Sequence, residues 1–254
     1  MQGQQKPDYL HDGANGDDPR NGHCKTGDMH GTTVVGHPRL FAGILPADYA
    51  RICRAASAKG FTRGELLHFE GDVVERVSLL TSGSVKITKL GRGGEEVILR
   101  LAIPGDVLGA VGLFSCGKSC TSAQVLRPCR ALVWGAPVFK DLVESFPILH
   151  RNSVAILEEH LRELEERFRE VATDRVGARV ALQLLRLLKT IGRPVDGGVE
   201  IALSREELGQ MTGTTLFTVS RLLSAWETRG VVIPRREAVA ICDVQSLRAI
   251  SEEE

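Results

Sequence analysis

Two cysteines separated by three residues, Cys116 and Cys120, have the residue type and spacing for redox chemistry of thiols. The thiolate is the reactive form of cysteine, and a nearby cation lowers the thiol pKa. Lys118 lies between the two cysteines and is expected to act in this way. A disulfide between them, or haem ligation by one cysteine or a histidine, would respond to redox state or a diatomic gas. The alternative is that these cysteines only fill a core as small hydrophobic residues.

Residues 204–230, SREELGQMTGTTLFTVSRLLSAWETRG, predict two short helices joined by a tight turn. Ser204 and Glu207 have the spacing of a capping box, and Gly213 permits the turn because it lacks a Cβ atom. The second helix has an apolar face, and its other face suits the DNA major groove, where arginine can bond guanine O6 and N7 together. The DNA-contacting residues expected here are Thr214, Thr215, Phe217, Thr218, Ser220, Arg221 and Ser224. An ordinary helical hairpin inside a core is the competing interpretation.

The residues after this hairpin favour DNA binding. Residues 231–234 and 238–241 are strand-like, and they flank the charged turn Arg235-Arg236-Glu237. This pattern predicts a wing whose basic tip, Arg235 and Arg236, contacts phosphates. The formal net charge of the chain is zero. Any DNA contact must therefore come from a local basic face rather than from a generally basic surface.

A long helix is predicted over residues 147–172, because apolar residues recur there at alternating spacings of three and four. Its flanks are dense in glutamate and arginine, so the apolar stripe needs a partner. We expect this seam to form a two-helix homodimer, with packing against the chain's own strands as the alternative. The seam residues are Val154, Leu157, Leu161, Leu164, Phe168 and Val171. A second helix is predicted over residues 176–191, followed by the connection Gly192-Arg193-Pro194.

Short strands with glycine-bearing turns are predicted between residues 64 and 134, which indicates an antiparallel sandwich or roll. The expected strands span residues 66–69, 77–81, 84–89 and 97–102, with Ser82-Gly83 as one of the turns. Residues 38–60 are predicted to form a helical lead-in, and residues 137–146 a short helix. Paired carboxylates, a nucleophile triad or a phosphate loop with catalytic spacing are not found, so we expect no enzyme. A thiol redox enzyme using Cys116 and Cys120 is the alternative from that class, although no Cys-x-x-Cys pair occurs.

Residues 1–37 are rich in Gly, Asp, Asn and His, and we predict a disordered tail there. A metal site in the tail would use its histidines and Cys24, but their spacing fits no known closed site. No run approaches the roughly 20 apolar residues that cross a bilayer, and the first residues show no secretory signal pattern. We therefore expect a cytoplasmic protein with no membrane partner.

The order of roll, long helix and winged helix-turn-helix resembles the CRP/FNR family of bacterial transcription regulators. The motifs that carry the resemblance are Gly83-Ser84-Val85, residues 94–99 (GEEVIL), residues 104–109 (PGDVLG) and the helix-turn-helix. The resemblance implies an α+β fold with a cyclic-nucleotide-binding-type antiparallel β-roll as sensor (38–146), a dimerisation helix (147–172) and a C-terminal winged helix-turn-helix (173–254). It also implies a homodimer on near-palindromic double-stranded DNA, with RNA polymerase as a partner and effector-controlled DNA affinity.

The chain departs from the family pattern in the effector loop, for which we single out Gly109, Ala110, Cys116, Lys118, Cys120 and Thr121. In cyclic-AMP-responsive members, this loop carries a Glu for the ribose and an Arg-Ser pair for the phosphate. Ala110 stands in the place of the Glu, and Cys120 and Thr121 stand in the places of the Arg-Ser pair. Losing the arginine fork removes the main charge partner of a cyclic phosphate, and Lys118 is an imperfect substitute. We therefore expect a redox or gas signal rather than cyclic AMP, with a cyclic-nucleotide-responsive regulator as the alternative.

Two further expectations follow from the resemblance. The FNR branch holds an iron–sulfur cluster, which in most cases needs four thiolates. Cys24, Cys116, Cys120 and Cys129 would supply them only if the tail folds over the roll. In the recognition helix, Phe217 stands where many members carry a Glu that reads cytosine, while Ser220 and Arg221 match. Phe217 would instead contact a thymine methyl group.

Overall fold

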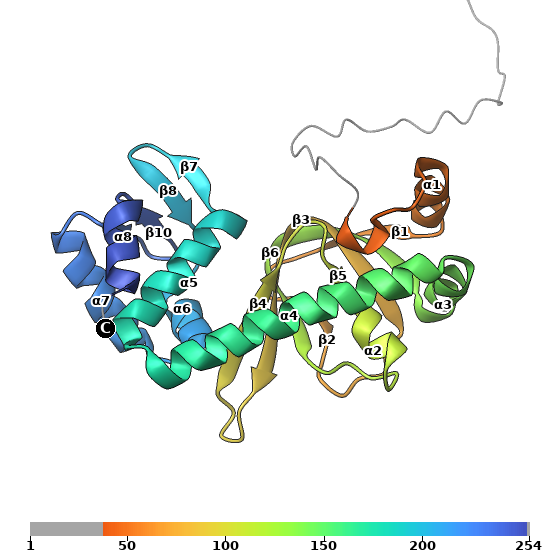
Figure 1. Cartoon of the computed structure of the whole chain (residues 1–254), viewed down its shortest axis with the longest axis horizontal. Coiled ribbons are helices and arrows are strands. Elements are labelled where there is room, and N and C mark those ends of the chain that lie inside the picture. The colour runs from red at the N-terminus through yellow and green to blue at the C-terminus, as the bar shows by residue number, and fades with distance from the viewer. Residues whose placement is uncertain (1–37, 253–254) are drawn as a thin grey trace, which may run out of the picture. The chain divides into compact units, whose positions relative to one another are not determined.

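Two long antiparallel strands organise the first half of the chain. The computed structural model describes residues 38–252, in which β3 (Arg76–Leu90) pairs along most of its length with β6 (Ser122–Gly135). The sheet order is β1-β6-β3-β4, with β1 at Ser57–Phe61 and β4 at Glu96–Ala102. The short strands β2 (Leu66–His68) and β5 (Val107–Leu108) pair with β6 and β3 (Figure 1). These strands form the predicted antiparallel roll.

The Ser82-Gly83 pair does not form the turn that the sequence predicts. It lies inside β3, where the pairing with β6 shifts register on both sides of it. Gly83 has φ +77°, and a Cβ atom on it would collide with the carbonyl oxygen of Pro128 on β6. Glycine therefore serves a bulge within one long strand, and the two strands predicted over 77–81 and 84–89 are one.

The helical lead-in predicted over residues 38–60 is shorter than expected. The segment contains a 3₁₀ turn η1 (Arg39–Phe41) and the helix α1 (Pro46–Arg54), and the chain then enters β1. β1 pairs in register with residues 129–133 of β6. This distant pairing, rather than local propensity, decides the conformation of residues 57–60.

Four helices follow the strands of the roll or are inserted among them. α2 (Ala110–Phe114) follows β5, and α3 (Ala136–Ser145) follows β6. Proline at the first helical position then opens α4 (Pro147–Thr173). α5 (Val176–Ile191) has the bounds that the sequence predicts, because Asp174 adopts an extended conformation and breaks the helix at the expected place.

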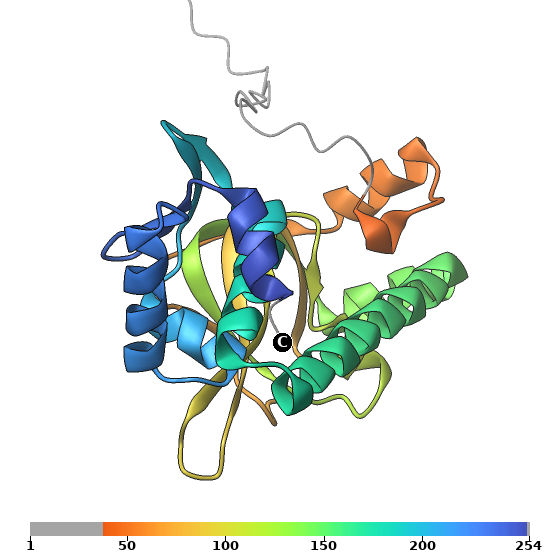
Figure 2. The same ribbon diagram turned by 60° about the vertical axis from the view of Figure 1, so that its left-hand side comes forward.

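The C-terminal unit is a winged helix-turn-helix with one strand pair more than predicted. Its sheet has the order β7-β8-β10-β9, formed by Arg193–Val195, Gly198–Ile201, Val239–Ile241 and Val232–Pro234. The connection expected at residues 192–194 is thus largely the first strand of a hairpin. The helices are α6 (Arg205–Thr212), α7 (Leu216–Thr228) and α8 (Val244–Ser251), and α8 packs beside α5 (Figure 2). The helix α8 was not predicted.

Three hydrophobic clusters form the core of the described residues. One fills the roll, and a second joins η1, α1 and α3 to the roll around Trp134, whose indole nitrogen donates to the carbonyl of Ile52 at 2.9 Å. The third is the core of the winged helix, and it includes Ile98 and Leu126 from the roll. None of the helices between residues 38 and 252 is long and apolar enough to cross a membrane. The predicted tail, residues 1–37, lies outside the described residues.

Candidate DNA-binding surface and effector cavity

Capping and a glycine turn fix the geometry of the helix-turn-helix. The backbone nitrogen of Ser204 donates to the Glu207 carboxylate at 2.7 Å, and the nitrogen of Glu207 donates to the Ser204 hydroxyl at 3.1 Å. Gly213 ends α6 with φ +63° in the left-handed region. Thr215 caps α7 by accepting from the nitrogen of Thr218 at 3.2 Å. Thr215, rather than Thr214, is therefore the cap of the second helix.

The two faces of α7 differ as the sequence predicts. Val219, Leu223 and Trp226 are buried in the core of the winged helix, and Leu222 is half-buried. Opposite them, Phe217 is 80% exposed, which is unusual for a phenylalanine without a partner surface. Thr215, Arg221 and Ser224 are also exposed, while Thr214, Thr218 and Ser220 are half-buried. The candidate DNA-contacting residues therefore lie on or beside one face.

The wing is present, but ion pairs engage part of its charged turn. Arg235 pairs with Glu200 on β8, and Glu237 accepts from both terminal nitrogens of Arg63 at 2.8 and 3.2 Å. This pairing lowers the pKa of Glu237 and raises that of Arg63. Arg235 and Arg236 are both exposed. Arg236 thus keeps its position at the tip, while Arg235 shares its charge with Glu200.

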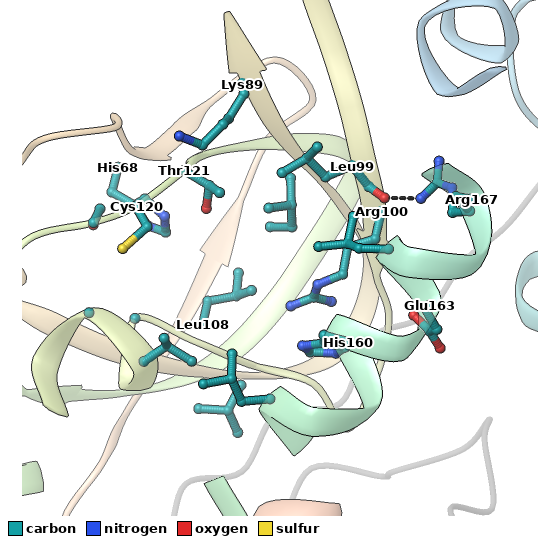
Figure 3. Close-up of a pocket in the computed structure, with 18 residues that line it drawn as sticks. His68, Lys89, Leu99, Arg100, Leu108, Cys120, Thr121, His160, Glu163 and Arg167 are labelled. Atoms are coloured by element: carbon teal, nitrogen blue, oxygen red, sulfur yellow. Dashed lines mark hydrogen bonds between the residues drawn. The ribbon is translucent and has the colours of Figure 1, made fainter. Parts of the chain in front are cut away.

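A cavity of about 340 Å³ lies between the strands of the roll and α4. Figure 3 shows His68, Lys89, Cys120 and Thr121 at one end, and Arg100, His160, Glu163 and Arg167 at the other. Between these ends the walls are mostly apolar, with Ile87, Leu99, Val107, Leu108, Val111, Leu157 and Leu164 as lining residues. Such a volume suits a small molecule.

The residues of the predicted effector loop separate into two groups. Gly109, Cys120 and Thr121 line the cavity. Ala110 is buried at the start of α2, in the cluster that includes Trp134. Cys116 is exposed, and neither it nor Lys118 lines the cavity. The loop therefore presents one of its two cysteines to the cavity.

The pKa of Cys116 is lowered, as expected, but the positive charge of Lys118 is not the cause. The pKa of Cys116 is lowered first by hydrogen bonding with the backbone of Lys118, and then by the Ser115 hydroxyl. The Lys118 ammonium is not among the causes. The thiol of Cys129 differs, because burial on β6 raises its pKa and its side chain belongs to the core of the roll. Cys129 does not line the cavity.

The described part of the chain does not assemble a metal site. No group of three or more His, Cys, Asp or Glu side chains within residues 38–252 is placed to hold an ion. Cys116, Cys120 and Cys129 therefore do not form a set of three ligands, although the thiols of Cys116 and Cys120 interact with each other. Cys24 lies outside the described residues. This finding does not support the four-cysteine cluster. Haem ligation remains a prediction, with Cys120, His68 and His160 on the cavity lining.

Sequence reasoning missed the charged groups at the α4 end of the cavity. Arg100 interrupts the apolar run of β4, and that interruption was the available signal. Its guanidinium lies 3.4 Å from the Asp106 carboxylate, and burial is the largest cause that lowers its pKa. His160 has a pKa lowered to about 4, mainly by burial and then by the positive charge of Arg100. His160 is therefore neutral near pH 7.

All six seam residues of α4 are exposed in the single chain. Their exposed fractions run from 42% at Leu164 to 76% at Phe168, with Val154, Leu157, Leu161 and Val171 between these values. The helix contacts its own chain through other positions, such as Leu149 and Ser153. The chain's own roll therefore leaves much of the seam surface uncovered. Leu157 and Leu164 also line the cavity.

Comparison with known proteins identifies the family. The cyclic nucleotide-binding domain model matches residues 58–146, and the Crp-like helix-turn-helix domain model matches residues 178–250. The chain belongs to the CRP/FNR family of transcription regulators. It is thus a DNA-binding transcription regulator rather than an enzyme. The thiol redox enzyme alternative is wrong.

Relatives and solved structures align with most of this chain. A CRP-like cAMP-activated global transcriptional regulator of Mycobacterium tuberculosis is 26% identical over 84% of this chain and 96% of its own length. The cyclic AMP receptor protein of Thermus thermophilus is 28% identical over 76% of this chain and 87% of its own. The structure of the c-di-GMP responsive global regulator CLP of Xanthomonas campestris superposes with a TM-score of 0.69 and 18% identity. That match covers 78% of this chain and 99% of the other.

Proposed function

We propose that this CRP/FNR-family regulator acts as a homodimer, and that a signal received at the roll cavity switches its affinity for a near-palindromic DNA site. The observation that carries the proposal is the position of Leu157 and Leu164. They belong to the exposed seam of α4 and also line the cavity. A ligand in the cavity would therefore touch the helix that joins the two subunits.

The seam supports the dimer on physical grounds. Six large apolar side chains at heptad spacing, all exposed on one helix, are typical of a two-stranded coiled coil. Exposed apolar stripes of this size are rare on monomeric proteins. Two-fold symmetry of the dimer would set two α7 helices on half-sites about one helical turn apart. RNA polymerase is the further partner that we expect for such a regulator.

The test of this function is a selection of bound sequences from random duplex DNA by the full-length protein. We expect the recovered sites to contain two half-sites related by a dyad, with centres about 10 base pairs apart. Recovery of single half-sites, or of no common sequence, would contradict the proposal. Sedimentation of the protein with a recovered duplex gives the number of subunits bound per site.

For the signal that switches DNA affinity, we favour redox state or a diatomic gas over cyclic AMP. This signal is favoured by the Cys120 thiol on the cavity wall and by the lowered thiol pKa of the exposed Cys116. A Cys116→Ser, Cys120→Ser double variant tests it. We expect the double variant to lose the change in DNA affinity that the parent shows between reducing and oxidising buffers. An unchanged response would remove thiol chemistry at this pair as the signal.

An absorption spectrum of protein purified without oxygen tests the cofactor candidates. Broad absorption at about 400 nm together with iron would indicate an iron–sulfur cluster. A sharp Soret band would indicate haem. A colourless protein without metal would remove both. Calorimetry with cyclic AMP tests the remaining alternative.

A further inference from the structure

Two thiols meet in the loop between α2 and β6, at the edge of the cavity. Cys116 and Cys120 are both exposed, and their thiols interact with each other. Cys120 also lines the cavity (Figure 3), whereas Cys116 does not. The pair therefore has one thiol that faces solvent alone and one that also reaches the cavity.

Backbone hydrogen bonds fix the residues between the two cysteines. The nitrogen of Gly117 donates to the carbonyl of Gly112 at 2.9 Å. The nitrogen of Ser119 donates to the carbonyl of Asp72, and the carbonyl of Ser119 accepts from the nitrogen of Gly71, both at 2.8 Å. These bonds hold the intervening backbone in one conformation, so the two thiols stay within reach of each other.

The surroundings of Cys116 favour its thiolate. The Ser115 hydroxyl donates to its sulfur at 3.9 Å, and its thiol donates to the carbonyl of Lys118 at 3.8 Å. The pKa of Cys116 is lowered, first by hydrogen bonding with the backbone of Lys118 and then by Ser115. Cysteines that sense oxidants are exposed, have a lowered pKa and often lie next to a second cysteine. Cys116 meets all three conditions.

The other cysteines within residues 38–252 lack this combination. Burial raises the pKa of Cys53 and that of Cys129, which disfavours their reactive thiolate forms. Cys242 is exposed, but it follows β10 in the winged helix and not the loop that holds the pair. An oxidant that reaches the folded protein should therefore react first at Cys116.

We propose that hydrogen peroxide is the signal of this regulator and that it joins Cys116 to Cys120 in a disulfide, with Cys116 as the attacking thiol and Cys120 as the resolving thiol. The inference rests on the redox candidate of the proposed function, for which it names the oxidant and the role of each cysteine. A small, neutral two-electron oxidant needs no binding pocket to reach an exposed thiolate.

The reaction balances in two steps. The Cys116 thiolate attacks one oxygen of hydrogen peroxide, the O–O bond breaks and hydroxide leaves, which gives a sulfenic acid (S–OH) on Cys116. The Cys120 thiolate then attacks the Cys116 sulfur, the S–O bond breaks, and the oxygen takes up a proton and leaves as water. In total, two thiols lose two electrons and two protons, and one peroxide becomes two water molecules.

The disulfide would change the cavity as well as the loop. It bonds the Cys120 sulfur to a residue that does not line the cavity. Oxidation therefore draws one sulfur away from the cavity wall beside Thr121 and stiffens the connection between α2 and β6. Redox state is in this way linked to the site from which, under the proposed function, DNA affinity is switched.

Tryptic peptides report the bond directly, because trypsin cleaves after Lys118, between the two cysteines. Full-length protein is treated with hydrogen peroxide, its free thiols are blocked, and it is digested without reductant. We expect peptide 101–118 joined to peptide 119–130, with a mass two hydrogens below the sum of the two, and their separation by dithiothreitol. Peptide 119–130 also contains Cys129, so the same product from Cys129→Ala assigns the bond to Cys120. Absence of the joined peptides would overturn the inference.

Dimedone, which labels sulfenic acids, assigns the two roles. In Cys120→Ser, peroxide should leave Cys116 as a sulfenic acid that dimedone labels. In Cys116→Ser, the Cys120 thiol should react with peroxide at least about tenfold more slowly than Cys116 does in Cys120→Ser. Cys242→Ser is the matched control, because it removes an exposed thiol outside the loop and should leave the joined peptides unchanged. Equal labelling rates at the two positions would overturn the assigned roles.

These results are distinguishable from failure of the proposed function. Sites selected from random DNA under reducing conditions report on the dimer and on recognition, and they require no disulfide. A protein that selects dyad sites but does not join the two cysteines would retain the proposed function and lose this inference. A disulfide that forms without any change in DNA affinity would overturn the role of peroxide as the signal.

Discussion

At the scale of single residues, Arg221 is the exposed arginine of the α7 face that we expect to read DNA. We predict that Arg221→Ala lowers affinity for the selected site by about 1–3 kcal/mol and relaxes the base preference at one position per half-site. The physical reason is the loss of a bidentate contact to guanine. Fluorescence anisotropy with the selected duplex and with its single-base variants measures both effects.

Arg229→Ala is the control for this prediction, because Arg229 is exposed at the end of α7, away from the predicted base-reading residues. It should weaken binding to all sequences similarly if it contacts phosphate. An equal loss on selected and random DNA for Arg221→Ala would show that Arg221 contacts only phosphate.

His160 predicts a pH dependence of stability. Its pKa is about 4 in the folded protein, below the ordinary value of 6.5. Between these two pH values, His160 is therefore mostly protonated in the unfolded chain and mostly neutral in the folded chain. The free energy of unfolding should therefore fall as the pH is lowered from about 6.5 to about 4. Because His160 is only half-buried, we expect a contribution of about 1–2 kcal/mol rather than the full value of the shift.

The variant His160→Gln tests this dependence by urea denaturation at pH 7 and pH 5. The loss of stability between the two pH values should be smaller in the variant than in the parent. An unchanged loss would show that other groups carry the acid sensitivity.

At the scale of elements, we propose that the α4 seam decides association. We predict that Leu161→Glu converts the dimer to a monomer at micromolar concentration, because it would bury two unpaired carboxylates in the seam at a cost of several kcal/mol. Sedimentation equilibrium measures the change. Arg162→Glu introduces the same side chain one residue away from the seam and should leave the dimer intact. A dimeric Leu161→Glu variant would argue against the coiled coil.

The elements also show which parts of the fold local sequence patterns predict. The bounds of α5, the capping box of α6 and the inward face of α7 follow from residues within a few positions of one another. The strands at Ser57–Phe61 and Arg193–Val195 were missed, because each is defined by pairing with a partner strand. The merging of two predicted strands into β3 has the same cause.

At the scale of the whole molecule, the roll contributes Ile98 and Leu126 to the hydrophobic core of the winged helix. Leu126 of the roll is 6% exposed and belongs to the cluster of the winged helix, and Arg127 beside it donates to the carbonyl of Ala202. We predict that Leu126→Ala lowers the free energy of unfolding by about 2–4 kcal/mol. Leu90→Ala, at a leucine of the same roll that is 66% exposed, should change it by less than about 0.5 kcal/mol.

Scanning calorimetry and urea denaturation distinguish the outcomes. A shared core should give one main unfolding transition that Leu126→Ala lowers as a whole. A small effect equal to that of Leu90→Ala would show that the two units do not stabilise each other through this contact.

The sequence alone determined the family pattern, the helix-turn-helix and the exposed heptad seam. Spacings of three and four residues, helix caps and turn glycines predict these features, and each of these signals acts over a few neighbouring positions. Only the tertiary structure decided what lines the cavity. Arg167 and Leu99 meet across 68 residues of chain, and Cys120 faces the cavity while Cys116 does not. Such placements depend on strand register and on the packing of α4 against the roll, which no local spacing specifies.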